Sequence, residues 1–256
     1  MQKAKSGFWK YRKYHLDKMT LGDLFKAYFQ YYAIQIYIVV GVGCIGYGLY
    51  TGAPLPGLIW SALWSILAFP FFWYLLHRYV LHGTWLARSQ FTSALWKRIH
   101  FDHHQDPHDL HILFGAVYTT LPTIALGVIP AGYLIAGWPG AWVAMGTGSL
   151  VYCFYEFCHC FEHLSYKPKY KFLMRMKQLH MAHHFHNEQG NYGITNFLWD
   201  YIFQTYYHNK NRPPKSATVY NLGYDKAMAA KYPWVAELSG GVSNDSPRDR
   251  RQQYQA

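Results

Sequence analysis

The sequence contains few charged residues, since Asp, Glu, Lys and Arg make up only 14% of its 256 residues. Soluble domains carry about 25%. The charge is also one-sided, with 13 acidic residues against 24 Lys and Arg. Hydrophobic residues make up 51% of the chain. This composition argues against an ordinary soluble domain and directs attention to apolar segments that could cross a membrane.

Cysteine is scarce as well, and the sequence has no CxxC pair. Free cysteine behaves as a small apolar residue and is commonly buried. We therefore expect free thiols and no disulfide framework from the four cysteines, Cys44, Cys153, Cys158 and Cys160. A cleavable signal peptide is not expected either, because a polar segment follows the basic start of the chain.

Four stretches carry no charge, and each is about long enough to cross a ~30 Å hydrocarbon core as a helix. They are residues 33–50, 57–76, 112–137 and 138–155. Short connectors, TGAPLPG and GWPG, join them in pairs and predict two helical hairpins. A buried core helix is the alternative for one or two of these stretches. The sequence thus predicts an all-α integral membrane protein with four transmembrane helices.

The two short connectors contain no Lys or Arg, and the other segments between and beside the apolar stretches carry them. The positive-inside rule then places both termini, the middle loop and any site beside them in the cytoplasm of a multi-pass protein. The same placement argues against nucleic acid as a partner, although the net charge is +11.

Three segments are expected along the chain. Residues 1–32 form a cytosolic N-terminal segment, in which Thr20 caps an interfacial helix or an ordinary packing helix. Residues 33–239 form a single membrane domain with a cytosolic helical cap. Residues 240–256 are polar and are predicted to be a disordered tail.

Histidine is the feature that stands out. Ten of the 15 histidines fall into four clusters, HRYVLH, HFDHH, HCFEH and HMAHH. In each half of the chain, two histidines that are four or five residues apart precede an HxxHH motif. The ten are His77, His82, His100, His103, His104, His159, His163, His180, His183 and His184.

The two pairs are predicted to lie at the same depth, because His77 directly follows the second apolar stretch and a helix of ~20 residues counted from Gly140 ends near Cys160, next to His159. Residues three and four apart share a helix face, so each HxxHH presents three imidazoles together. The five-residue step from His77 to His82 fits an ideal helix poorly. A π-bulge, a helix end, or ligation of two different metals would accommodate it.

Ten imidazoles are more than one tetrahedral zinc ion needs, and two ions with about five nitrogens each would use them all. Imidazole suits iron, copper, nickel and zinc. Metal-bound histidines usually donate their other N–H to a carboxylate or a carbonyl oxygen. We therefore consider five nearby acids as supporting residues: Asp102, Asp106, Asp109, Glu156 and Glu162. A solvated surface carboxylate is the alternative for all of them except Glu156, which lies inside the fourth span.

These clusters resemble the histidine boxes of the membrane fatty acid hydroxylase/sterol desaturase superfamily, most of all those of fatty acid 2-hydroxylases. The segment QLHMAHHFHNEQGNYGITNFLWDYIFQTYY is similar to that group's last box and the stretch after it. The resemblance covers about residues 70–208. One departure is that Phe114-Gly115-Ala116 stands where a proline pair is expected.

By this resemblance the ten histidines bind two iron ions, with zinc as an alternative occupant after purification. The chain would be an oxygen-dependent monooxygenase that hydroxylates a lipid acyl chain of a fatty acid or sphingolipid. No fused cytochrome b5-like domain is seen, so electrons are expected from a separate carrier, a ferredoxin or cytochrome b5, with its reductase. The alternatives are a carotenoid- or sterol-modifying hydroxylase or desaturase, and a non-enzymatic membrane metal-binding or transport protein.

Overall fold

The computed structural model describes residues 14–242 and 245–246. Those residues form helices and loops and contain no β-strand. In chain order the α-helices are α1 (Leu21–Gln30), α2 (Tyr32–Tyr50), α3 (Leu55–Leu75), α4 (Ser93–Trp96), α5 (Asp102–Gln105), α6 (Leu110–Leu113), α7 (Val117–His163), α8 (Lys171–Phe185), α9 (Leu198–Ile202), α10 (Lys226–Lys231) and α11 (Trp234–Ser239). Two π-helical segments, η2 (Leu76–Leu81) and η4 (Lys97–Phe101), lie among them.

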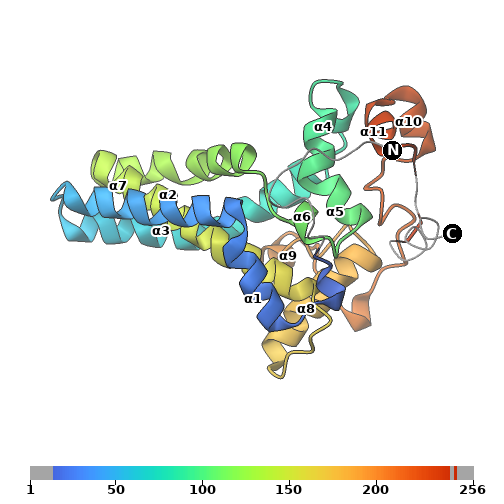
Figure 1. The fold of residues 1–256 in the computed structure, drawn as a ribbon, viewed down its shortest axis with the longest axis horizontal. Coiled ribbons are helices and arrows are strands. Elements are labelled where there is room, and N and C mark those ends of the chain that lie inside the picture. Colours follow the sequence, from blue (N-terminus) through green and yellow to red (C-terminus); the bar gives the residue numbers. More distant parts are fainter. Residues whose placement is uncertain (1–13, 243–244, 247–256) are drawn as a thin grey trace.

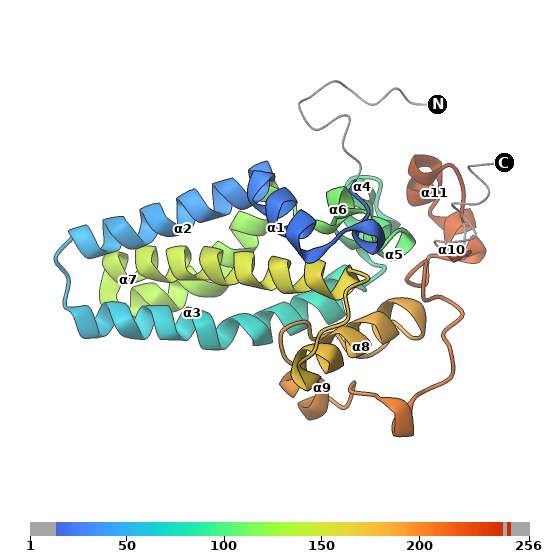
Figure 2. The ribbon, with the colours of Figure 1, turned by 60° about the horizontal axis from the view of Figure 1, so that its bottom comes forward.

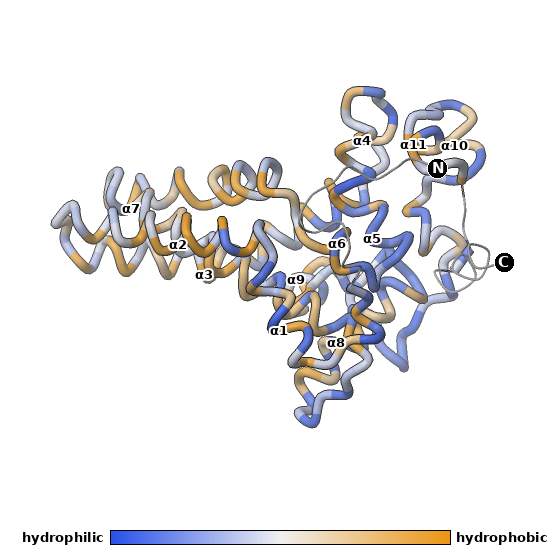
Figure 3. Tube along the Cα trace, in the orientation of Figure 1, coloured by the Kyte–Doolittle hydropathy of each residue, from blue (hydrophilic) through white to orange (hydrophobic). Residues whose placement is uncertain are grey.

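The long helices α2, α3 and α7 form an elongated bundle, and the shorter helices gather at one end of it (Figures 1 and 2). We call this end, residues 76–116 and 164–242, the cap. Apolar residues follow the bundle along its length, whereas polar residues concentrate in the cap (Figure 3). In the described part of the chain, three segments are long and apolar enough to cross a membrane: Tyr32–Tyr50, Leu55–Arg88 and Leu110–His163.

The third of these segments contains a reversal of the chain. Within α7, Ala136 and Gly137 have non-helical backbone angles, and Gly137 has a φ of +62°. Residues 132 and 144 would be about 18 Å apart along a continuous helix. Yet a Cβ built on Gly132 would lie 2.6 Å from the Cβ of Ala144. The two halves of α7 therefore run back along each other, as the second predicted hairpin requires.

The ends of α7 differ from the predicted stretches 112–137 and 138–155. The helix begins at Val117, because residues 114–116 are extended or bent and separate it from α6. It continues to His163, past the uncharged stretch and close to Cys160, where the helix count placed its end. The second half of α7 thus carries the HCFEH cluster out of the bundle and into the cap.

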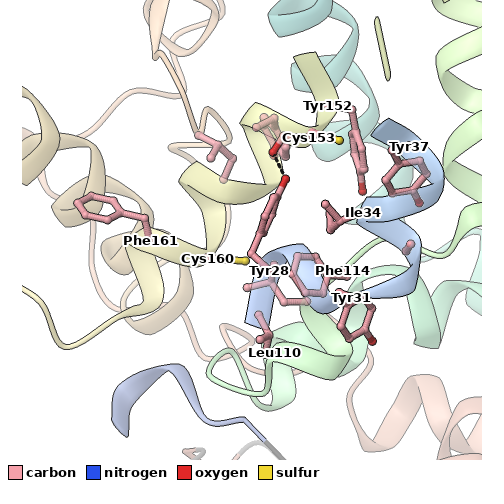
Figure 4. Packing of buried hydrophobic residues seen from close by; sticks show 14 of the residues in the cluster. Tyr28, Tyr31, Ile34, Tyr37, Leu110, Phe114, Tyr152, Cys153, Cys160 and Phe161 are labelled. Carbon is pink, nitrogen blue, oxygen red and sulfur yellow. Dashed lines mark hydrogen bonds between the residues drawn. The ribbon is translucent and has the colours of Figure 1, made fainter. Parts of the chain in front are cut away.

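An aromatic cluster joins α1 to the bundle at the start of the cap (Figure 4). The hydroxyl of Tyr28 donates a hydrogen bond to the carbonyl oxygen of Cys153, and that of Tyr37 donates to the carbonyl oxygen of Gly115 at 2.9 Å. Phe114 packs on Tyr31 with ring centroids 4.4 Å apart. These contacts fix α1 against the segment that leads into α7. The four cysteines are free, as expected.

Thr20 caps α1, as predicted. Its hydroxyl oxygen accepts from the backbone N–H of Asp23 at 3.1 Å, and the Asp23 carboxylate accepts from the backbone N–H of Thr20 at 3.0 Å. Most of the predicted disordered tail, residues 243–244 and 247–256, lies outside the described residues.

The close contact inside α7 gives a test of this fold. Replacing Gly132 by alanine should destabilise the protein by about 1–3 kcal/mol, because the new methyl group overlaps Ala144 in a packed interior. The measurement is thermal unfolding of the purified protein in detergent. Gly43→Ala is the matched control, since a Cβ at this helical glycine meets nothing within 4 Å. Equal unfolding midpoints for the two variants would contradict the packed reversal.

Candidate metal centre

The first histidine pair lies where α3 widens into the π-helix η2. The backbone N–H of His82 donates to the carbonyl oxygen of His77 at 3.1 Å, a bond five residues long. The wider turn brings the two side chains onto one face, with their Nε2 atoms 3.2 Å apart. A π-helical turn, one of the three predicted accommodations, is therefore the one that the structure uses.

The other clusters come from η4 with α5, from the end of α7, and from α8. His100 lies at the end of the π-helical turn η4, and His103 and His104 follow in α5. His159 and His163 occupy the last turns of α7. The whole HMAHH sequence lies within α8.

The ten side chains meet as two groups of five. Within each group the nearest ring nitrogens all lie within 4.8 Å of one another. The first histidine group is His77, His82, His100, His104 and His183. The second histidine group is His103, His159, His163, His180 and His184.

Each HxxHH is divided between the groups. The segment after the first pair gives its outer histidines, His100 and His104, to the first group and its middle one, His103, to the second. The segment after the second pair gives its outer histidines, His180 and His184, to the second group and its middle one, His183, to the first. The groups adjoin, since the ring centroids of His104 and His184 are 4.2 Å apart. The sequence predicted one shared site but not this exchange.

Nine of the ten histidines are buried and His82 is half-buried. Burial lowers the pKa of His104 to about 3. Burial, together with the neighbouring imidazoles, lowers the pKa well below the usual histidine value for five further histidines of these groups, His100, His103, His180, His183 and His184. These rings are therefore neutral near pH 7, and each keeps one lone pair for a metal ion.

In the first group, backbone carbonyl oxygens fix the tautomer of three rings. The Nδ1–H groups of His77, His104 and His183 donate to carbonyl oxygens at 2.6, 3.0 and 2.7 Å. The acceptors are the carbonyl oxygens of Tyr192, Val219 and Gly190. Since a carbonyl oxygen can only accept, Nδ1 carries the proton and Nε2 carries the lone pair in all three rings.

Three Nε2 atoms of this group form a triangle. The distances are 3.1 Å between His77 and His100, 3.2 Å between His77 and His82, and 3.0 Å between His82 and His100. Hydrogen bonds cannot fill such a triangle, because each N–H points to a single acceptor and the Nε2 of His77 has no proton. A cation among the nitrogens satisfies all three lone pairs. The residues present thus fit a metal ion.

The second group is supported by a carboxylate. Glu162 is fully buried, and its Oε2 lies 3.9 Å from Nδ1 of His180. Its carbonyl oxygen accepts from the Lys177 ammonium at 2.9 Å. The Nε2 atoms of His163 and His180 approach to 2.9 Å, and those of His103 and His159 to 3.0 Å. These close pairs of ring nitrogens also fit a metal ion, here with a buried carboxyl group beside it.

The other predicted supporting acids have different surroundings. Asp102 pairs with Lys97 at 2.6 Å, and Asp109 caps α6 by accepting from the N–H of His111. Asp106 is half-buried beside α5. Glu156 is buried within α7, where it accepts from the hydroxyl of Tyr152 and from the N–H of Gly115.

Asp200 is a supporting residue that the sequence reasoning missed. Its buried carboxylate accepts from the N–H groups of Tyr192 and Gly193, both at 2.8 Å, and from the Thr205 hydroxyl at 2.7 Å. It therefore holds the loop whose carbonyl oxygen orients His77. The only sequence signal was its place in the Gly-rich stretch after the last histidine box. Asp200 acts through the backbone carbonyl of Tyr192, and a backbone carbonyl cannot be recognised from the residue type.

A largely apolar cavity of about 280 Å³ borders both histidine groups. His77 and His100 of the first group and His103 and His159 of the second form part of its wall. The remaining wall comes from the bundle and the cap and includes Trp73, Leu76, Leu95, Ile99, Thr123 and Tyr155. Thr119, Thr120 and Glu156 give one side of it polar character.

Residues 62–205, which hold all ten clustered histidines, match the model of the fatty acid hydroxylase family. The chain belongs to this family. A dihydroceramide fatty acyl 2-hydroxylase of Arabidopsis thaliana is 30% identical over 66% of this chain and 70% of its own length. The human fatty acid 2-hydroxylase is 30% identical over 59% of this chain.

The fold agrees with this membership. The hydroxylase domain of full-length Scs7p superimposes with a TM-score of 0.58 and 25% identity, over 82% of this chain and 73% of that one. The ceramide very long chain fatty acid hydroxylase of Saccharomyces cerevisiae is 31% identical over 52% of this chain. The chain spans only 34% of the yeast hydroxylase and 39% of the human one. Together with the histidine groups, the family membership points to metal binding.

The role of Asp200 can be tested without touching a histidine. Asp200→Ala should weaken retention of the bound metal by about tenfold or more, because outer partners of metal-binding histidines typically contribute 10–100-fold. The measurement is metal content by mass spectrometry after dialysis against increasing chelator. Asp225→Ala, which removes an N-cap from α10, is the control. Equal metal loss from both variants would show that the Asp200 contacts do not support the site.

Proposed function

We propose that this member of the fatty acid hydroxylase family is a membrane monooxygenase that hydroxylates a lipid acyl chain at carbon 2. The observation that carries the proposal is the cavity that touches both histidine groups. It is mostly apolar with a few polar groups, as ligand pockets generally are. The position and the sphingolipid or fatty acid class follow from the names of the Arabidopsis and human relatives.

The reaction balances as R–CH2–R′ with dioxygen, two electrons and two protons giving R–CH(OH)–R′ and water. Bound iron would supply the activation of dioxygen. Iron, one ion in each histidine group, is our proposal because imidazole sets suit it and the reaction is oxidative. The protein's part is to hold the chain against the imidazoles and to exclude water, with Trp73, Leu76 and Leu95 as apolar walls. The carbonyl partners keep the first-group rings in one orientation.

We further propose that the protein crosses the membrane four times. The two halves of α7 would each cross once, because their reversal at residues 136–137 lies at the same end of the bundle as the α2–α3 connector (Figure 2). Both termini and the metal centre would then be cytoplasmic, as the distribution of Lys and Arg requires. Residues 33–239 would be one domain, and electrons would come from a separate carrier.

The N-terminal segment would lie on the membrane surface. α1 exposes Leu21, Phe25 and Phe29 while Leu24 and Tyr28 are buried against the bundle. An exposed apolar stripe beside the bundle is suited to the interface between lipid and water. Residues 1–32 would therefore form a cytosolic segment with an interfacial helix.

Loss of one first-group histidine tests the catalytic proposal. His183→Ala should abolish 2-hydroxylated acyl chains in a bacterial host given iron and a reductase system, while the protein remains in the membrane fraction. Mass spectrometry of the lipid extract is the measurement. His15→Ala, outside both groups, should retain product. Full activity of His183→Ala would refute the proposed site, and loss of two hydrogens from the lipid would reveal a desaturase instead.

The topology can be tested by cysteine labelling with a membrane-impermeant maleimide in intact cells, with the unmodified protein as the background. Thr51→Cys and Trp138→Cys should both react, because the two hairpin turns lie on the outer side. Lys226→Cys, in the cap, should react only after the cells are opened. Reaction of only one of the two turn variants would rule out four crossings, and reaction of Lys226→Cys in intact cells would rule out a cytoplasmic cap.

A further inference from the structure

A second large depression lies in the cap, on the side of α8 that faces away from the histidines. It has a volume of about 610 Å³ and is lined by α8 and by residues that precede it and follow α9. We call it the α8 groove. Its lining includes the apolar Met181 and Phe185 and the basic Lys167, Lys177 and Arg212. The opposite face of α8 carries His180, His183 and His184, so one helix separates the groove from both histidine groups.

The surface around the groove is positively charged. Residues 164–224 contain eight Lys and Arg, seven of them exposed and Lys177 half-buried: Lys167, Lys169, Lys171, Arg175, Lys177, Lys210, Arg212 and Lys215. The acidic residues in the same range are Glu188 and Asp200, and both are buried. Residues 164–224 therefore present cations with no exposed carboxylate among them.

Two sets of contacts connect the groove to the imidazoles. The ring of Phe185 lies against the groove and also beside His184, with centroids 6.4 Å apart. The Lys177 ammonium donates to the carbonyl oxygen of Glu162, whose carboxylate faces His180. Both connections end at the second histidine group.

We propose that the α8 groove is the docking site of a small acidic protein that carries one electron at a time. The inference rests on the proposed monooxygenase function, which consumes two electrons per turnover. Two successive carriers would each be oxidised by one electron, and dioxygen would be reduced. Complexes of this kind are small, transient and steered by opposite charges. Met174 and Met181 give the groove an adaptable apolar surface that such a partner can use.

The test measures binding directly and does not depend on activity. The full chain is placed in nanodiscs of neutral phosphatidylcholine, and its affinity for a soluble acidic [2Fe–2S] ferredoxin and for a cytochrome b5 haem domain is measured by interferometry at rising salt. Lys167→Glu/Arg212→Glu reverses two charges at the groove. Lys226→Glu/Lys231→Glu makes the same change in charge on α10, which lies elsewhere in the cap (Figure 1).

At least one carrier should bind the parent protein, more weakly as salt rises. The groove variant should bind that carrier about tenfold more weakly at low salt, and the α10 variant should bind it as the parent does. Equal binding by both variants, or no binding of either carrier, would overturn the proposal. It would also be overturned if the groove variant altered only the binding of added phosphatidylserine vesicles, because the cations would then serve lipid headgroups.

Hydroxylation supported by chemically reduced mediators separates this inference from the proposed function. If the parent protein forms product with mediators while the groove variant keeps its affinity for the carrier, the docking site is wrong and the function stands. If no reductant supports product formation, the proposed function itself fails.

Discussion

The clustered imidazoles set the main constraint on this structure, because they are buried, neutral and directed at one another. Each neutral ring has one N–H, and three rings of the first group use theirs on backbone carbonyl oxygens. Their lone pairs then meet other ring nitrogens. Leaving a buried polar atom unsatisfied costs about 1–3 kcal/mol, so cations among the convergent imidazoles would stabilise them.

The exchange of His103 and His183 makes the two halves of the site inseparable. Each half of the chain supplies four histidines to its own group and one to the other. A metal ion in the first group would therefore connect η2, η4, α5 and α8, and one in the second group would connect α5, α7 and α8. The cap is held over the end of the bundle by the same residues that would do the chemistry, and the cavity lies where both groups reach the bundle.

Much of this arrangement could be predicted from the sequence. Uncharged length located the long helices, and the four short clusters identified all ten histidines of the two groups. The division of each HxxHH could not be foreseen, because His103 and His104 are neighbours on one helix and only the packing of α5 against α7 and α8 separates their targets. The backbone carbonyl oxygens that accept from the histidines could not be predicted from the sequence, because every residue type has one. Asp102 was expected beside the metals for its position in HFDHH, yet the nearby Lys97 holds it.

The central claim is that two metal ions share these histidines in the crossed arrangement. Anomalous X-ray diffraction at the iron edge, on crystals of the purified chain loaded with iron, tests it most directly. We expect two peaks, one enclosed by the first histidine group including His183 and the other by the second group including His103. A single peak, or two peaks that each have all three histidines of one HxxHH as ligands, would contradict the account.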